Sequence, residues 1–175
     1  MNEFELKNII EALLMSSGEP LTLNRMLAIF DDWQKPTTEQ LKSIINELDV
    51  EYQSKGIELK LLASGYVLQT KKSLSHWVSR LMPEKATKYS SAFLEVLAII
   101  AYKQPVTRAE IEEIRGVAVS SAMLKTLIEH EWISIAGNRD VIGKPAVYIT
   151  TKEFLDHFNL ASISDLPPLR VLINE

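Results

Sequence analysis

Residues 98–107 read AIIAYKQPVT, and residues 12–22 read ALLMSSGEPLT. Both stretches open with alanine and two branched aliphatic residues, and both close with proline, an aliphatic residue and threonine. The spacing from alanine to proline differs by one residue. A motif repeated about half a chain apart suggests that the chain contains two copies of one structural unit. The residues around each copy test this interpretation.

The residues around the first copy predict three helices and a hairpin. The apolar positions of the first helix have the 3-4 spacing of an amphipathic helix: Leu6, Ile9, Ile10, Leu13 and Leu14. Thr22 can cap a second, short helix that runs to about Phe30. The third helix carries five apolar residues on one face: Leu41, Ile44, Ile45, Leu48 and Tyr52. Two β-like runs, IELKLLA and YVLQT, then meet across a tight turn, and SLSHWVSRL closes the unit.

The residues around the second copy predict the same order. A helix that begins near Phe93 ends before Pro105, because the residue preceding a proline avoids the helical region. Thr107 and Glu110 form a capping box for a second helix, which ends at Gly116. A third helix places four apolar residues inward: Met123, Leu124, Leu127 and Ile128. WISIA and AVYIT then flank a longer loop, and TKEFLDHFNL closes the unit.

Helix, short helix, helix, hairpin and closing helix is the order of a helix-turn-helix with a β wing. We therefore predict a mainly α fold with small β wings (α+β), made of two tandem winged-helix domains. The domains span residues 1–83 and 88–160, on either side of the polar stretch MPEKATKYSS at 82–91. Residues 161–175 form an extended, proline-containing tail.

Composition narrows the functional classes. A hydrophobic fraction of 46% with 24% charged residues is ordinary for a globular protein in water. The chain has no cysteine, so disulfides, thiolate metal sites and a cysteine nucleophile are excluded. The acidic, amphipathic start MNEFELKNII is not typical of a signal peptide, and the apolar run Val96–Ala101 is too short for a bilayer. We expect a cytoplasmic protein without a membrane anchor.

A helix-turn-helix is typical of DNA-binding regulators, which need basic or amide side chains facing the bases. The expected outward face of the first domain's third helix mixes acids with other polar residues: Glu39, Lys42, Asn46, Asp49 and Gln53. The corresponding face in the second domain is similarly poor: Ser121, Ala122, Lys125 and Glu129. The net charge of −4 offers no basic excess. A DNA-binding transcription regulator is therefore the alternative interpretation, and protein–protein interaction is preferred, without direct sequence-specific DNA binding.

Catalysis has little support in the sequence. The three histidines, His76, His130 and His157, have no serine, carboxylate or second histidine at triad or metal-ligand spacing. The acidic cluster of Glu110, Glu112 and Glu113 fits a helix dipole better than an active site. We therefore predict no catalytic residue, no metal site and no cofactor, and a chain that is not an enzyme.

Apolar residues point to burial on more than one side of the second domain's first helix. Residues 93–100 read FLEVLAII and leave almost no polar face. Two interpretations remain open: the helix packs only within its own chain, or one side of it binds another protein. The apolar tail LPPLRVLINE suits an extended peptide lying on a surface.

The stretch AIIAYKQPVTRAEIEEIRGV at 98–117 resembles the signature of the bacterial segregation and condensation protein B family. ALLMSSGEPLT, the wing GNRDVIGKPAVYITTKEFLDHFNL and the closing DLPPL at 165–169 are also similar to this family. The likeness covers nearly the whole chain in the same order. Four positions depart from the family pattern: Val119, Ala122, Glu131 and Lys144.

The resemblance implies a function as well as a fold. Members of the family are non-catalytic accessory subunits of the bacterial condensin, and act in chromosome condensation and segregation. They form homodimers, largely through the first domain, and bind the kleisin subunit, segregation and condensation protein A. The kleisin links them indirectly to the structural-maintenance-of-chromosomes ATPase. The implied location is the cytoplasm, in association with the nucleoid.

Carried over to this sequence, the resemblance implies a kleisin site on the second domain: Tyr102, Lys103, Gln104, Arg108, Arg115, Asn138, Arg139 and Lys144. Lys144 stands where the family's wing usually has arginine, and lysine cannot form the same bidentate contacts. Arg108 has a second interpretation, because it can instead form a surface ion pair with Glu112 one turn along the helix. For the homodimer we expect apolar residues that the first domain exposes: Leu21, Leu23 and Leu27.

Overall fold

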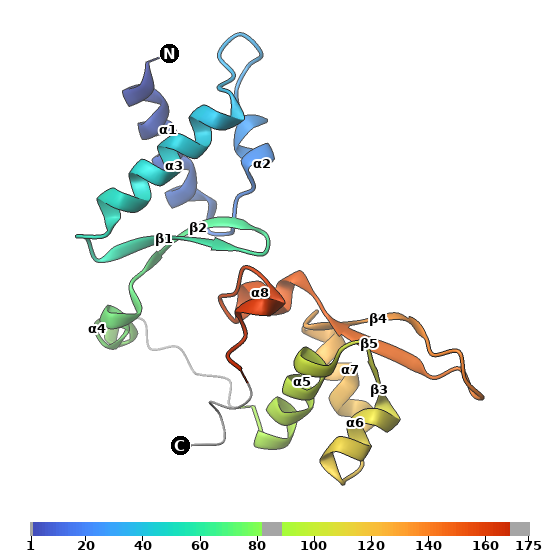
Figure 1. The fold of residues 1–175 in the computed structure, drawn as a ribbon. Coiled ribbons are helices and arrows are strands. Elements are labelled where there is room, and N and C mark those ends of the chain that lie inside the picture. Colours follow the sequence, from blue (N-terminus) through green and yellow to red (C-terminus); the bar gives the residue numbers. More distant parts are fainter. Residues whose placement is uncertain (1, 82–88, 169–175) are drawn as a thin grey trace. The chain divides into compact units, whose positions relative to one another are not determined.

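The computed structural model of this chain describes residues 2–81 and 89–168 (Figure 1). The chain forms two compact units, Met1–Lys85 and Ala86–Glu175, and each is described by itself. The predicted domain limits at residues 83 and 88 lie outside the described residues, as does the end of the predicted tail from 169 onward. The division into domains with separate roles therefore stays a prediction.

The first unit has three helices, a two-stranded hairpin and a closing helix. Its elements are α1 (Glu3–Ser17), α2 (Leu23–Leu27), α3 (Thr38–Tyr52), β1 (Ile57–Leu62), β2 (Gly65–Thr70) and α4 (Ser75–Leu81), with a 3-10 turn at Lys72–Leu74. Helices α1 and α3 both begin with a capping box, in which a side chain at the N-cap and one three residues later exchange bonds with the backbone. The core lies between these helices and the hairpin.

The second unit repeats this order with one additional short strand. Its elements are α5 (Ser91–Lys103), β3 (Val106–Thr107), α6 (Arg108–Arg115), α7 (Ser121–Glu129), β4 (Ile133–Asn138), β5 (Ala146–Thr150) and α8 (Lys152–His157), with a 3-10 turn at Ile163–Asp165. The three strands form an antiparallel sheet in the order β3-β5-β4. Figure 1 shows α5, α6 and α7 gathered on one side of this wing. The predicted α+β fold of two winged helices is confirmed.

The repeated motif has the same structural role in both units. Its aliphatic residue pairs with the second strand of the wing: Leu21 and Tyr66 exchange backbone hydrogen bonds of 2.8 and 2.9 Å, and Val106 pairs with Tyr148. Its threonine then caps the second helix, because the side chains of Thr22 and Thr107 each accept from a backbone N–H three residues later. The motif therefore joins the wing to the helix-turn-helix.

This pairing corrects the expectation that Leu21 is exposed and available to a dimer. Leu21 is only 3% exposed, because its backbone extends the hairpin and its side chain enters the first core. Leu23 and Leu27 are half-buried against the same core. All three residues pack within their own unit, and their role in the homodimer stays a prediction.

Two further positions differ from the predicted pattern. Ile128 was expected to point inward, and Ile9 to belong to the apolar stripe of the first helix, but both are exposed. Each lies at the edge of an apolar stripe, where a helix of 3.6 residues per turn rotates the side chain away from the core. The second helix also ends earlier than expected, at Leu27, since Ala28 already lies in the C-cap position.

Gly65 is the position at which the first unit tolerates no side chain. A Cβ there would lie 2.4 Å from the backbone carbonyl of Leu21, and its φ of +136° is one that other residues rarely adopt. Gly18 also has a positive φ, of +63°, but a Cβ there would meet nothing within 4 Å. A side chain at Gly65 would therefore meet both a backbone clash and conformational strain, whereas one at Gly18 would meet conformational strain alone.

We expect Gly65→Ala to lower the free energy of unfolding of the first unit by on the order of 3 kcal/mol or more, because the Leu21–Tyr66 pairing must break. Gly18→Ala should cost only about 1 kcal/mol. Hydrogen exchange of the β1–β2 amides, measured by mass spectrometry, reports both values. Equal losses in the two variants would contradict the close approach of Leu21 to Gly65.

Candidate partner-binding surface of the second unit

The carboxylate of Glu110 joins the start of α6 to the wing. It accepts a 2.7 Å hydrogen bond from the backbone N–H of Thr107, and both its oxygens lie 2.8 Å from Nη2 of Arg139. The same Arg139 nitrogen donates to the carbonyl of Pro105 at 3.1 Å. The Thr107 N–H and then the guanidinium lower the pKa of Glu110 from its usual value. Arg139 is thus engaged within its own unit.

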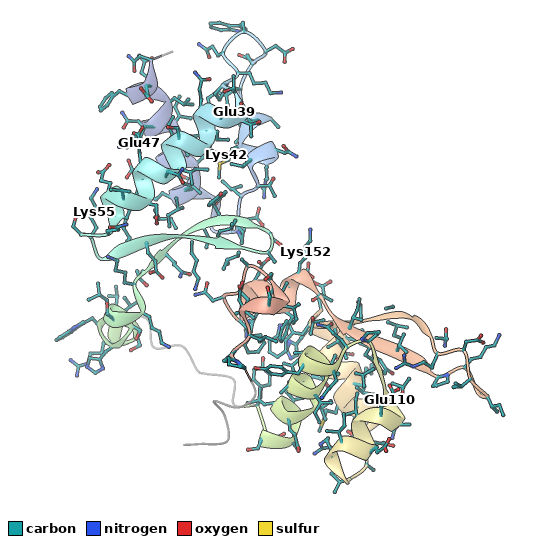
Figure 2. All side chains as sticks on the ribbon, in the orientation of Figure 1. Glu39, Lys42, Glu47, Lys55, Glu110 and Lys152 are labelled. Carbon is teal, nitrogen blue, oxygen red and sulfur yellow. The ribbon has the colours of Figure 1, made fainter. Side chains whose placement is uncertain are left out.

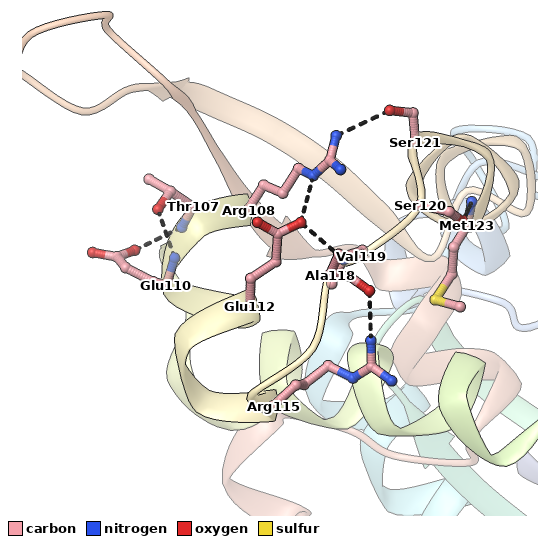
Figure 3. Close-up of polar contacts among 10 residues, drawn as sticks. All are labelled: Thr107, Arg108, Glu110, Glu112, Arg115, Ala118, Val119, Ser120, Ser121 and Met123. Atoms are coloured by element: carbon pink, nitrogen blue, oxygen red, sulfur yellow. Dashed lines mark hydrogen bonds and ion pairs between the residues drawn. The ribbon is translucent and has the colours of Figure 1, made fainter.

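The carboxylate of Glu112 holds the turn between α6 and α7 (Figure 3). Its Oε1 accepts from the backbone N–H of Val119 at 2.8 Å and from Nε of Arg108 at 2.9 Å. Arg108 also donates through Nη1 to the hydroxyl of Ser121, at 3.0 Å. The Val119 N–H, and after it Arg108, lower the pKa of Glu112. The ion pair that the sequence left open for Arg108 is therefore present.

Arg115 ties the end of α6 back to α5. Its Nε donates to Glu95 at 2.9 Å, and its Nη1 donates to the carbonyl of Ala118 at 3.4 Å (Figure 3). The Arg115 side chain is only 6% exposed. A guanidinium this well covered has little surface left for a partner, so its position fits a structural role.

Three more of the predicted kleisin residues also have partners within the unit. Gln104 accepts from the N–H of Thr150, at 2.6 Å, and from its hydroxyl, which anchors the end of α5 to β5. The hydroxyl of Tyr102 donates to the carbonyl of Pro167 at 2.5 Å. The amide of Asn138 donates to the carbonyl of Lys144, at 2.7 Å, across the tip of the wing.

Lys103 and Lys144 are the exceptions in the predicted set. Both side chains are exposed, and neither amine has an ion pair or hydrogen bond within residues 2–81 and 89–168. They come from different places, the end of α5 and the tip of the wing. Of the eight predicted residues, these two leave a charge fully available to a partner. The role of all eight in kleisin binding stays a prediction.

An apolar groove next to Tyr102 was not predicted as a site. It has a volume of about 330 Å³ and lies between α5, α8 and the segment that follows α8. Its lining is Leu94, Leu97, Ala98, Ala101, Tyr102, Phe154, Phe158, Leu160, Leu166 and Pro167. The all-round apolar pattern of residues 93–100 was the only signal for it, because the opposite wall forms only when the chain folds back over α5. Leu94 and Phe158 remain exposed beside it.

The third helices do not have the side chains of DNA-reading helices. Figure 2 labels Glu39, Lys42 and Glu47 on α3, so acidic and basic side chains both project from this helix. Lys7 lies 3.0 Å from Glu51 and 3.7 Å from Glu47. Hydrogen bonds from Lys55 and Lys7 lower the pKa of Glu51 to about 2. The exposed face of α3, with Glu39, Lys42 and Asp49, offers no basic excess for phosphate, which disfavours the alternative of a transcription regulator.

The histidines form no catalytic arrangement in the part of the chain that the structure describes. His130 stacks on Trp132, with ring centres 4.9 Å apart, and His157 lies 4.4 Å from the same indole. Burial, and then the neighbouring His130, lower the pKa of His157. Within residues 2–81 and 89–168 no three histidine or acidic side chains are grouped to hold a metal ion. No helix in these ranges is long and apolar enough to cross a bilayer.

The fold and surface therefore define a class: a tandem winged-helix protein whose exposed features suit binding to another protein. Comparison with known proteins gives the family. Residues 8–169 match the family model of the segregation and condensation complex subunit ScpB. The chain belongs to the segregation and condensation protein B family.

Individual relatives agree over nearly the full length. A segregation and condensation protein B homolog from Coxiella burnetii is 47% identical over 174 residues, covering 99% of this chain and 83% of the relative. The protein from Syntrophotalea carbinolica is 42% identical, covering 97% of this chain and 85% of the relative.

Two solved structures are also similar in sequence. Crystalline ScpB from Mycobacterium tuberculosis is 31% identical, with coverage of 91% and 98% and a TM-score of 0.43. A dimer of a ScpB N-terminal domain in complex with a ScpA peptide is 29% identical, covers 43% of this chain and 93% of its own, and has a TM-score of 0.39.

We expect acid to weaken the second unit through Glu112. Its pKa is lower in the folded than in the unfolded chain, so the ionised carboxylate stabilises the fold above the ordinary value of 4.5, and this contribution is lost as the pH falls below it. In Glu112→Gln the free energy of unfolding should fall less steeply between pH 5 and about pH 3. Urea unfolding followed by the fluorescence of Trp132, which is buried, measures it.

The matched control is Glu113→Gln, an exposed carboxylate on the same helix that takes no part in these bonds. It should leave the acid dependence unchanged. Identical pH profiles for Glu112→Gln and the unmodified protein would contradict the role of Glu112 in holding the turn.

Proposed function

We propose that this chain is a non-catalytic accessory subunit of the bacterial condensin. It binds the kleisin, segregation and condensation protein A, as a homodimer, and through it acts indirectly with the structural-maintenance-of-chromosomes ATPase. Its place would be the cytoplasm, with the nucleoid, in chromosome condensation and segregation. The observation that carries the proposal is the family match over residues 8–169.

The groove on α5 is the surface that best suits a kleisin segment. Leu94, Ala98 and Tyr102 are spaced by four residues, so they follow one face of the helix and form one wall. An amphipathic segment could place its apolar side chains along this wall, as helix-in-groove complexes do. Lys103, at the end of α5, has an exposed amine that suits an acidic residue of the same segment.

The internal bonds of Arg108, Arg115 and Arg139 assign these residues a different part in the proposal. They bond α6 to α7, to α5 and to the wing. A charge reversal such as Arg108→Glu would set two carboxylates against each other at Glu112. Loss of kleisin binding in that variant would then follow from a disturbed turn, so it cannot test direct contact.

We expect Leu94→Asp to weaken binding of the kleisin's central segment by tenfold or more (order of magnitude), since it places a charge in an apolar contact. Lys103→Glu should weaken it by about two- to tenfold, as is usual for a charge at an interface rim. Isothermal titration calorimetry of the full chain measures both.

The matched controls are Ile114→Asp, at an exposed aliphatic residue of α6, and Lys125→Glu, at an exposed lysine of α7. Both should bind the kleisin segment as tightly as the unmodified protein. If Leu94→Asp and Ile114→Asp bind equally well, the groove is not the kleisin site. If the unmodified chain shows no binding, the proposed function itself fails.

A further inference from the structure

The end of the first unit is an amphipathic segment whose apolar side is largely exposed among the described residues. Residues 72–81, here termed the arm, comprise the 3-10 turn and helix α4. Four apolar residues at i, i+3, i+4 and i+7 form one stripe: Leu74, Trp77, Val78 and Leu81. Trp77 is 65% exposed and Leu81 is 81% exposed, and no residue of α4 is buried.

Such a helix needs a partner to be stable. A helix of seven residues is well below the length at which isolated helices persist in water, so α4 must gain its stability from packing. In the unit as described it packs on neither α1 nor α3, and Figure 1 shows the hairpin lying between α4 and these helices. The apolar stripe therefore points to a contact outside this set of residues.

The same unit also carries an open apolar groove. It has a volume of about 560 Å³ and lies between α1 and the ends of β1 and β2. Ala12, Met15, Ile57 and Leu68 supply its apolar surface, and Met15 is 79% exposed. An unpartnered stripe and an unfilled groove of similar character on one unit suggest that they belong together.

The arm is held away from the groove of its own chain. The N–H of Lys71 donates to the carbonyl of Gly56 at 3.0 Å, and its amine donates to the carbonyl of Gln53 at 2.6 Å. Leu74 packs directly on Gly56, where an added Cβ would lie 2.9 Å from its Cδ1. Folding back across the hairpin would break these contacts, whereas docking on a second copy of the chain would preserve them.

Charge and area also favour a second copy. The arm carries Lys72 and Arg80 and no acidic residue, whereas the groove contains Glu11 and no basic residue. The exposed stripe offers on the order of 400 Å² of apolar surface. In a two-fold arrangement each chain buries one arm and one groove, so the two chains share two copies of the contact.

We propose that the arm of each chain docks in the groove between α1 and the hairpin of a second copy, so that two exchanged arms hold the homodimer together. The inference rests on the homodimer of the proposed function and names the surfaces that form it. Leu21, Leu23 and Leu27, the residues first expected at the dimer contact, lie in neither the arm nor the groove.

Two variants of the full chain test the contact, one with a changed arm and one with a changed groove. The arm variant is Trp77→Ser with Leu81→Ser, and the groove variant is Met15→Arg, which opposes the basic arm. All three positions are exposed in the isolated chain, so the unit should fold without them. The matched control is Trp33→Ser, since Trp33 is 80% exposed in the same unit but lies in neither the arm nor the groove.

Light scattering behind a sizing column should give about twice 19.8 kDa for the unmodified chain and for Trp33→Ser. In the arm variant and in the groove variant the dissociation constant of the dimer should rise about a hundredfold, so each variant should elute as a monomer. Mixing the two variants should restore dimers in part, because the intact arm of one chain fits the intact groove of the other.

Each alternative outcome is distinct. Dimers of unchanged stability in the arm variant would overturn the exchanged arm while leaving the proposed homodimer in place. Monomers in both variants without any recovery on mixing would show that the arm packs within its own chain or on another partner, and would also overturn it. A monomeric unmodified chain would contradict the homodimer itself, and kleisin titration of that monomer would test the rest of the proposed function separately.

Discussion

A short backbone pairing connects the wing to the helices in each unit, and the rest of the fold depends on it. Leu21 pairs with Tyr66 in the first unit, and Val106 and Thr107 pair with β5 in the second. In each unit a threonine, Thr22 or Thr107, then caps the second helix. The tripeptide of proline, an aliphatic residue and threonine therefore sets both the strand pairing and the helix that follows. This double role explains why proline, an aliphatic residue and threonine occur together twice in the chain.

In the second unit a polar framework surrounds this pairing. Glu110, Glu112 and Arg115 each join α6 to a different neighbour: the wing, the turn before α7, and α5. These three residues of the signature stretch at 98–117 therefore maintain the geometry of the unit. Charges that satisfy one another in this way contribute little to a binding surface, which is why the proposed kleisin site is the apolar groove beside Tyr102 with the exposed Lys103.

The sequence predicted the features whose causes are local. Caps such as Thr107 with Glu110, the glycine at 116 and the period of the helices involve neighbours within a few residues, so the fold class followed from them. The site depended on distant neighbours: Arg139 meets Glu110 from 29 positions away, and Arg115 meets Glu95 from 20. No local pattern encodes such pairs, and for that reason arginines expected on a partner surface were found bonded within the unit. The burial of Leu21 was missed for the same reason.

The stability of Arg115→Met tests most directly whether the signature residues serve the fold. Methionine keeps the apolar stem of the side chain but leaves Glu95 and the carbonyl of Ala118 without their donor. Urea unfolding followed at Trp132 should show a loss of about 1–3 kcal/mol for the second unit, while the folded variant still binds the kleisin segment with its original affinity. Unchanged stability together with lost kleisin binding would contradict this interpretation and return Arg115 to the partner surface.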